Sequence, residues 1–155
     1  MRSTNSVAAM KQGIEEFITS KSIAVVGVSR NGKKFGNSAL TELAKRGYEV
    51  FAVHPEAEEI AGTRCYPNLT ALHGKVDAVL ICISPGGVAG VLREAAAIGL
   101  KNVWLQQGAE SPEAIALAKE LKLNLVSGRC ILMYAPPVEG FHSWHRAIYR
   151  IFAKL

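Results

Sequence analysis

The chain has 155 residues, of which 49% are hydrophobic and 20% charged, a balance that excludes a disordered protein and suits one domain with a full core. Its formal net charge of +5 favours a polyanionic ligand, but aromatic residues make up only 7% and no RNA-stacking or helix-turn-helix pattern occurs, so we expect no nucleic-acid partner. No apolar stretch approaches the roughly 20 residues of a membrane span, and the N-terminus does not resemble a signal peptide, so we expect no membrane partner.

Short apolar runs alternate with helical patterns along the chain. The runs expected to form strands are residues 23–28, 48–53, 76–83, 102–106 and 124–127. The expected helices are residues 5–19, with an apolar stripe of Val7, Met10, Ile14, Phe17 and Ile18, a second helix with Asn37 or Ser38 as its N-cap and Gly47 after its end, then 84–98, 111–121 and 143–155. Residues 56–63 are expected to form a surface loop. This alternation predicts an α/β fold, a Rossmann-like doubly wound parallel sheet in a single domain, 1–155, with terminal helices in 1–20 and 141–155.

The stretch 23–37, IAVVGVSRNGKKFGN, places an apolar strand, a loop containing glycine and a helix start in that order. Loop N–H groups and the positive end of the helix then point into one crevice, which favours an anion. Arg30, Lys33 and Lys34 supply more positive charge than one phosphate needs. We therefore expect a ligand with several phosphates.

The end of the second strand separates the classes of nucleotide. The three glycine positions of the dinucleotide motif G-x-G-x-x-G correspond to Gly27, Ser29 and Gly32. An NAD-binding fold also needs an acidic residue about 20 residues further on, which binds the ribose hydroxyls. Here the strand ends at Val53-His54-Pro55 with no acid before Glu56, and the nearest arginine for a 2′-phosphate is Arg64. These features argue against both NAD and NADP as the ligand. An NAD(P)-dependent oxidoreductase or nucleotide-sensing subunit therefore remains only the alternative function.

Several short motifs occur in a characteristic order over residues 22–130. They are Gly27-Val28-Ser29, Arg46-Gly47-Tyr48, Val53-His54-Pro55, Gly62, Tyr66-Pro67-Asn68-Leu69, Ile83-Ser84-Pro85, Trp104 to Gly108, and Arg129-Cys130. Together they resemble the small stand-alone CoA-binding domain protein, which is related to the N-terminal CoA-binding domain of the succinyl-CoA synthetase α subunit. The resemblance implies a Rossmann-like fold that binds coenzyme A, or an acyl-CoA, as a small-molecule ligand.

The resemblance also implies a role for each matching position. The residues implied to hold the phosphates are Gly27, Ser29, Arg30, Lys33, Lys34, Phe35, Gly36 and Asn37. Val53, His54 and Pro55 would border the adenine, Ile83, Ser84 and Pro85 would line the path of the ligand, and Gln107 and Gly108 would stand near the pantetheine.

Three positions depart from the pattern of the family. His54 replaces the asparagine that small members usually carry, Tyr134 stands where a glutamate is often found, and Ala57 stands where the synthetase has a lysine. No Ser-His-Asp set is recognisable, and the catalytic histidine of the synthetase belongs to a second domain that has no counterpart here. We therefore expect a CoA-binding module without catalytic activity of its own.

The cysteines and the C-terminal histidines leave some alternatives open. Cys65, Cys82 and Cys130 are odd in number and show no paired motif, which indicates a reducing, cytoplasmic location. Cys82 is expected in the core, whereas Cys130 is either structural or, beside Arg129, near the sulfur end of the ligand. His142 and His145 have only Glu139 nearby as a possible further ligand, so no metal is expected. The apolar face of the last helix, with Trp144, either packs on the domain or forms a homo-oligomer contact.

Overall fold

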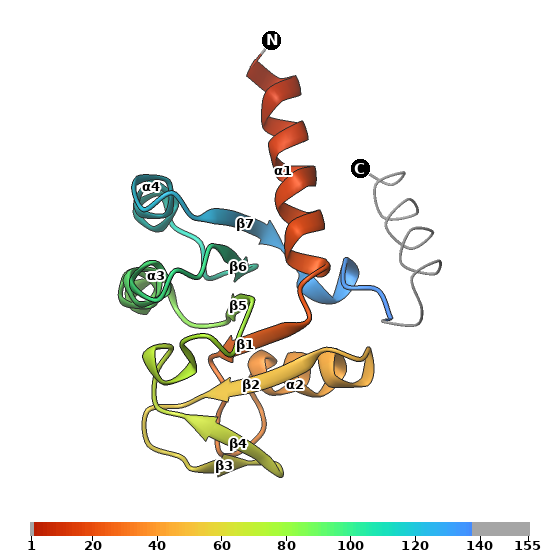
Figure 1. Ribbon diagram of the computed structural model, residues 1–155, viewed down its shortest axis with the longest axis vertical. Coiled ribbons are helices and arrows are strands. Elements are labelled where there is room, and N and C mark those ends of the chain that lie inside the picture. The colour runs from red at the N-terminus through yellow and green to blue at the C-terminus, as the bar shows by residue number, and fades with distance from the viewer. Residues whose placement is uncertain (1, 138–155) are drawn as a thin grey trace.

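The computed structural model describes residues 2–137, whose strands form one seven-stranded sheet in the order β3-β4-β2-β1-β5-β6-β7 (Figure 1). The strands are β1 (Ser22–Val26), β2 (Glu49–Val53), β3 (Glu59–Ile60), β4 (Thr63–Tyr66), β5 (Ala78–Ile81), β6 (Asn102–Gln106) and β7 (Asn124–Arg129). The helices are α1 (Arg2–Ile18), α2 (Phe35–Lys45), α3 (Val88–Ala97) and α4 (Pro112–Glu120), with short 3-10 helices at Thr70–Leu72, Pro85–Gly87 and Ile131–Met133. All pairings are parallel except that of β3 with β4, which confirms the predicted Rossmann-like α/β fold.

Two hydrophobic cores lie on opposite faces of the sheet. Helices α1 and α2 cover one face and α3 and α4 the other (Figure 1). One core contains side chains from α1 and α2, such as Phe17 and Leu43, and the other contains side chains from α3 and α4, such as Leu92 and Leu117. Every residue of β1 and β5 is buried, because both strands are central and covered by helices on both faces. The carboxyl ends of these strands therefore meet at one edge, where the chain order switches between β1 and β5.

Trp104 on β6 packs against helix α1 in the hydrophobic core on that face of the sheet. Its ring is fully buried and lies 5.3 Å from the ring of Phe17 in an edge-on arrangement. Its indole Nε1 donates to the backbone oxygen of Arg129 at 2.9 Å, so the polar atom of this large side chain is satisfied. Val7, which was expected on the apolar stripe of the first helix, is 49% exposed, so the packed part of α1 is its C-terminal half.

The segment predicted as a surface loop, residues 56–63, instead contains β3 and the start of β4. Ile60 pairs with Thr63 across the two-residue turn Ala61-Gly62, whose φ values are 50° and 78°. Positive φ at both central residues is the mark of a type I′ hairpin turn. The prediction was wrong because both strands are short and partly polar, and parallel pairing of β4 with β2 supplies a stabilisation that no local pattern reveals.

Several predicted boundaries shift. β1 ends at Val26 rather than Val28, β5 ends at Ile81 rather than Ile83, and β7 continues to Arg129. The helix expected from residue 84 begins as a 3-10 turn and becomes α3 only at Val88. The predicted helix over 143–155 and its Trp144 lie outside the described residues.

Candidate functional site

The junction between β1 and α2 is held by two glycines in very close contact. Gly27 has a φ of 112°, and a Cβ at this position would lie 2.3 Å from the carbonyl oxygen of Cys82. A Cβ at Gly36 would lie 2.3 Å from the carbonyl oxygen of Gly27. Gly32, in contrast, has open space around it, although its φ is 73°. Gly36, rather than Gly32, thus takes the part that the third glycine of the dinucleotide motif plays, the close packing of helix on strand.

Asn37 is not the N-cap of α2, which is a correction to the prediction. The helix begins at Phe35, and its N-cap residue Lys34 makes no side-chain capping bond. The buried side chain of Asn37 instead reaches back to Ser29: its Oδ1 accepts the Ser29 N–H at 2.9 Å, and its Nδ2 donates to the Ser29 carbonyl at 2.9 Å. The loop is therefore fixed by a side chain, while the helix start keeps the positive end that binds anions.

The remaining loop residues present charge to solvent. Asn31 accepts from the Ser29 hydroxyl at 2.7 Å and from the Lys33 N–H at 3.0 Å, so the turn is locally ordered. Lys33 and Lys34 are exposed. Arg30 reaches Glu56 in the connection after β2 at 3.9 Å, with both side chains mostly exposed, so this ion pair contributes little to stability.

His54, at the end of β2, is a structural turn residue. Its side-chain Nδ1 accepts the backbone N–H groups of Glu56 at 3.1 Å and Ala57 at 2.9 Å, and its backbone N–H donates to the Tyr66 carbonyl at 2.9 Å. Asparagine at a turn start accepts in the same way through Oδ1. His54 thus offers this turn the same kind of side-chain acceptor as an asparagine would.

A cleft of about 930 Å³ opens beside this junction. It is lined by Lys34, Phe35, Cys82, Ile83, Ser84, Pro85, Gly87, Gln106, Gln107, Gly108, Ala109 and Cys130. The cleft brings together predicted residues from the first loop, the end of β5 and the end of β6. The residues predicted to border the adenine, Val53, His54 and Pro55, do not line it.

Gln106, Gly87 and Ala109 also line the cleft, and none of them was predicted as a site residue. Gln106 is buried, and its Oε1 accepts the N–H of Ile131 at 3.1 Å, which fixes the start of the turn after β7. The only signal in the sequence was its place in the run Trp104 to Gly108, beside the predicted Gln107.

Cys82 was predicted to lie in the core, and this prediction was wrong. It follows the last residue of β5 and is only half-buried, with one side against the hydrophobic core and the other on the cleft. Burial raises the pKa of its thiol to about 12, and the neighbouring Cys130 adds to this increase. Cys82 therefore remains a neutral thiol at physiological pH.

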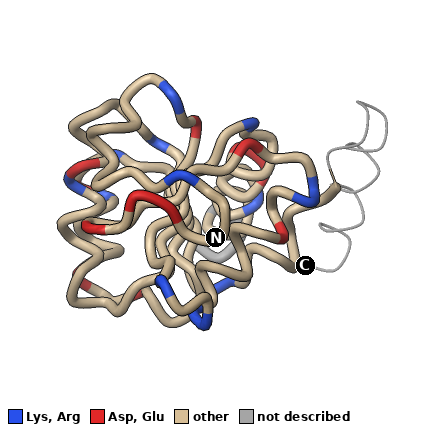
Figure 2. Tube along the Cα trace, turned by 90° about the horizontal axis from the view of Figure 1, so that it is seen from below, with Lys and Arg blue, Asp and Glu red and all other residues tan. Residues whose placement is uncertain are grey.

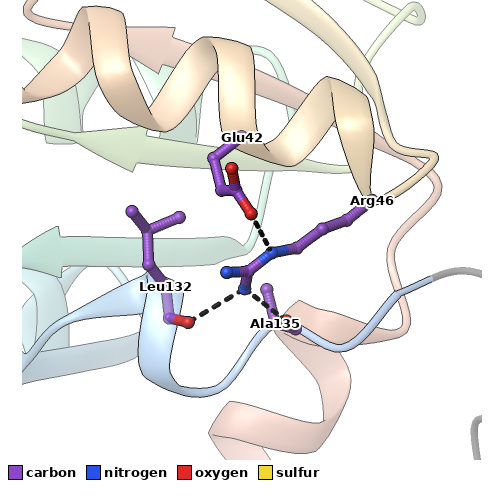
Figure 3. Close-up of polar contacts among 4 residues, drawn as sticks. All are labelled: Glu42, Arg46, Leu132 and Ala135. Atoms are coloured by element: carbon purple, nitrogen blue, oxygen red, sulfur yellow. Dashed lines mark hydrogen bonds and ion pairs between the residues drawn. The ribbon is translucent and has the colours of Figure 1, made fainter.

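Arg46, at the C-terminal end of α2, anchors the turn that follows Cys130 (Figure 3). Its Nη1 donates to the carbonyl oxygens of Leu132, at 2.9 Å, and Ala135, while its Nε is 3.1 Å from Oε1 of Glu42. These are charge-assisted bonds to two backbone groups far along the chain. One helix thus carries the loop junction at its first turn and holds the β7 side of the cleft at its last.

Charge is spread over the molecule rather than gathered on one face. Figure 2 shows Lys and Arg positions interspersed with Asp and Glu positions around the described part of the chain. Between residues 2 and 137, no cluster of three or more His, Cys, Asp or Glu side chains is arranged to hold a metal ion. His142 and His145 lie outside the described residues. Within the same range, no helix has the length and apolar character needed to cross a membrane.

The parallel sheet with its switch point, the glycine-packed strand-to-helix junction and the cleft at the strand ends define an α/β domain of the Rossmann-like class. Comparison with known proteins identifies the particular family. Residues 21–136 match the family described as "CoA binding domain", and the chain belongs to this family. The resemblance predicted from the sequence motifs is thereby confirmed.

Individual relatives agree with this assignment. The chain is 29% identical over 122 residues to the uncharacterized protein YneT of Bacillus subtilis, a match that covers 78% of this chain and 90% of YneT. It is also 29% identical over 124 residues to acetate–CoA ligase [ADP-forming] II of Archaeoglobus fulgidus, covering 77% of this chain but 18% of the ligase. The solved structure of a conserved hypothetical protein from Pyrococcus furiosus is 37% identical, with a TM-score of 0.69. That match covers 72% of this chain and 97% of the Pyrococcus furiosus chain.

Proposed function

We propose that the protein binds coenzyme A, or an acyl-CoA, with the diphosphate over the first turn of α2 and the pantetheine arm along the cleft. The observation that carries this proposal is the continuity of the cleft, which runs from Lys34 and Phe35 at the helix start to Gln107 and Gly108 beyond β6. Membership in the CoA binding domain family supports CoA as the ligand.

The phosphate end rests on the geometry of the junction. The helix start lacks a side-chain cap, and the close contacts of Gly27 and Gly36 pack it directly against the end of β1. The N–H groups of an uncapped helix start favour an anion. Arg30, Lys33 and Lys34 are exposed cations in the loop that leads into this point, which suits a diphosphate together with a 3′-phosphate.

The adenine end is proposed at the connection after β2. Pro55 is exposed there and offers apolar surface, whereas Val53 is buried in the core behind the strand end. His54 holds the turn in shape through its two accepted hydrogen bonds. No acidic residue ends β2, and Glu56 pairs with Arg30, so the ribose-binding acid of an NAD site is missing from this strand end.

Isothermal titration with CoA tests the proposal. A charge-assisted hydrogen bond to a phosphate contributes about 1.5–3 kcal/mol, so losing one weakens CoA binding by about tenfold or more. We expect this loss for Arg30→Ala and for at least one of Lys33→Ala and Lys34→Ala, and weaker CoA binding at raised salt. The loss should shrink with dephospho-CoA for whichever residue binds the 3′-phosphate. Lys119→Ala, at an exposed position in the last turn of α4, is the matched control.

Two results would overturn the proposal. If all three loop variants bind CoA like the parent, or if pantetheine alone binds as tightly as CoA, the phosphates do not lie at the first loop. A saturable NADH fluorescence signal at micromolar concentration would instead favour the nicotinamide alternative.

A further inference from the structure

Two thiols from different strand ends line the same cleft. Cys82 follows β5, Cys130 follows β7, and each is half-buried with its residue among those that form the cleft wall. The two side chains are close enough to influence each other electrostatically. The third cysteine, Cys65 on β4, is buried and does not line this cleft.

The cleft leads from the proposed phosphate position to these thiols. A ligand arm that leaves the start of α2 at Lys34 passes the end of β5 and then the end of β6, and the wall beyond is Cys130. On the function proposed above, on which this inference rests, that arm is the pantetheine of CoA, which ends in a sulfur atom.

We infer that Cys130 forms a mixed disulfide with the pantetheine sulfur of CoA by thiol–disulfide exchange with a CoA disulfide. The Cys130 thiolate attacks one sulfur of the CoA disulfide, the sulfur–sulfur bond of the reagent breaks, and a new bond joins Cys130 to the CoA sulfur. The other half leaves as a thiolate and takes up the proton that Cys130 released. The sulfur of Cys130 is oxidised, that of the leaving thiol is reduced, and the low-molecular-weight disulfide is the oxidant.

The environments of the two cysteines decide which one attacks. The thiolate is the nucleophile, and burial keeps Cys82 protonated, with a pKa of about 12. Cys130 lies outside the hydrophobic clusters, and the backbone that follows it is held in place by two side chains. Gln106 binds the N–H of the next residue, and Arg46 holds the turn that follows (Figure 3). A rigid position in reach of a bound ligand favours attack by Cys130.

The mixed disulfide is expected to persist rather than resolve into a bond within the protein. Strand β6 lies between β5 and β7. Adjacent strands are about 4.8 Å apart, so Cys82 and Cys130 leave the sheet about 10 Å apart. A disulfide needs Cα atoms within about 7 Å, and the neutral Cys82 thiol is a poor attacking group.

Intact-protein mass spectrometry after incubation with CoA disulfide tests the inference. We expect one CoA adduct per chain, removed by dithiothreitol, present in Cys82→Ser and in the control Cys65→Ser, and absent in Cys130→Ser. At equal concentrations, oxidised glutathione should react more slowly by on the order of tenfold or more, because only the CoA disulfide is concentrated in the cleft by binding. Peptide mapping of the parent adduct identifies the modified cysteine even if a variant fails to fold.

The outcomes separate this inference from the proposed function. If CoA binds in titrations run in reducing buffer, but incubation with CoA disulfide leaves no adduct on Cys130, the inference is overturned and the proposed function stands. If CoA does not bind at all, the proposed function is overturned. An adduct on Cys82, a bond between Cys82 and Cys130, or equal rates with both disulfides would each overturn the inference.

Discussion

Replacing Gly36 with alanine adds one methyl group at the tightest point of the strand-to-helix junction. The added Cβ would lie 2.3 Å from the carbonyl oxygen of Gly27, whereas real Cβ contacts are essentially never below 3.0 Å. The helix must therefore move away from Gly27 by about 0.7 Å or more. Gly27 has little room to yield, because it lies in close contact with the backbone of Cys82. Alanine gains at most about 1 kcal/mol in helix propensity, and overpacking of this kind costs about 1–3 kcal/mol or more. Because the obstacle is backbone rather than a flexible side chain, the cost should lie near the upper end of that range. After the propensity gain is subtracted, we expect Gly36→Ala to lower the free energy of unfolding by about 1–2 kcal/mol.

Gly90 provides the matched control, because it lies in α3 with no heavy atom within 4 Å of an added Cβ. There the same substitution should raise stability by about 0.5–1 kcal/mol, because only helix propensity changes. Urea unfolding of the parent and both variants measures the two effects, which have opposite signs. If Gly36→Ala is as stable as the parent, the junction yields to the methyl group and the close-packing argument is wrong. CoA titration of Gly36→Ala should also show weaker binding by about tenfold, since the anion site lies at the displaced turn.

Three further predictions concern side chains at the ends of the elements. Arg46→Ala removes the charge-assisted bonds to Leu132 and Ala135 and should lower the free energy of unfolding by about 2–4 kcal/mol in urea titrations, with Arg46→Lys recovering only part of it. A change within 0.5 kcal/mol, typical of an uninvolved surface site, would contradict this role. His54→Ala should cost about 1–2 kcal/mol because two backbone N–H groups lose their acceptor, whereas His54→Asn should stay near the parent, and equal losses in both variants would contradict the turn role. For Cys82, burial raises the pKa from 9.0 to about 12, so the folded state keeps a proton that the unfolded chain releases above pH 9. The parent should therefore exceed Cys82→Ala in free energy of unfolding by its largest margin below pH 9, and this margin should shrink as the pH rises toward 12. A margin independent of pH would refute the prediction.

The local elements of the fold follow from short-range patterns in the sequence. A helix was predicted over residues 111–121, and the Ser111 Oγ indeed caps its start by accepting the Ala114 N–H at 3.1 Å. Gly47, expected after the end of the second helix, has the left-handed φ of 98° that this position requires. Strand β6 has the predicted bounds, because a buried apolar run between clear turns leaves little choice.

The edge of the sheet depended on tertiary pairing. Strands β3 and β4 are short, and their hydrogen bonds go to β2 and to each other. A segment of this kind satisfies its backbone only after distant strands are in place, so a window of neighbouring residues carries no sign of it.

The candidate site divides in the same way. The residue types of the first loop and their order pointed to a phosphate ligand, because glycines, cations and a helix start are adjacent in the chain. The tertiary structure decided that Asn37 binds Ser29 instead of capping the helix, and that Gly36 packs on Gly27. It also decided that Arg46 grips carbonyls 86 and 89 residues away. These contacts depend on where two strand ends and a helix meet, and that geometry exists only once the sheet has formed.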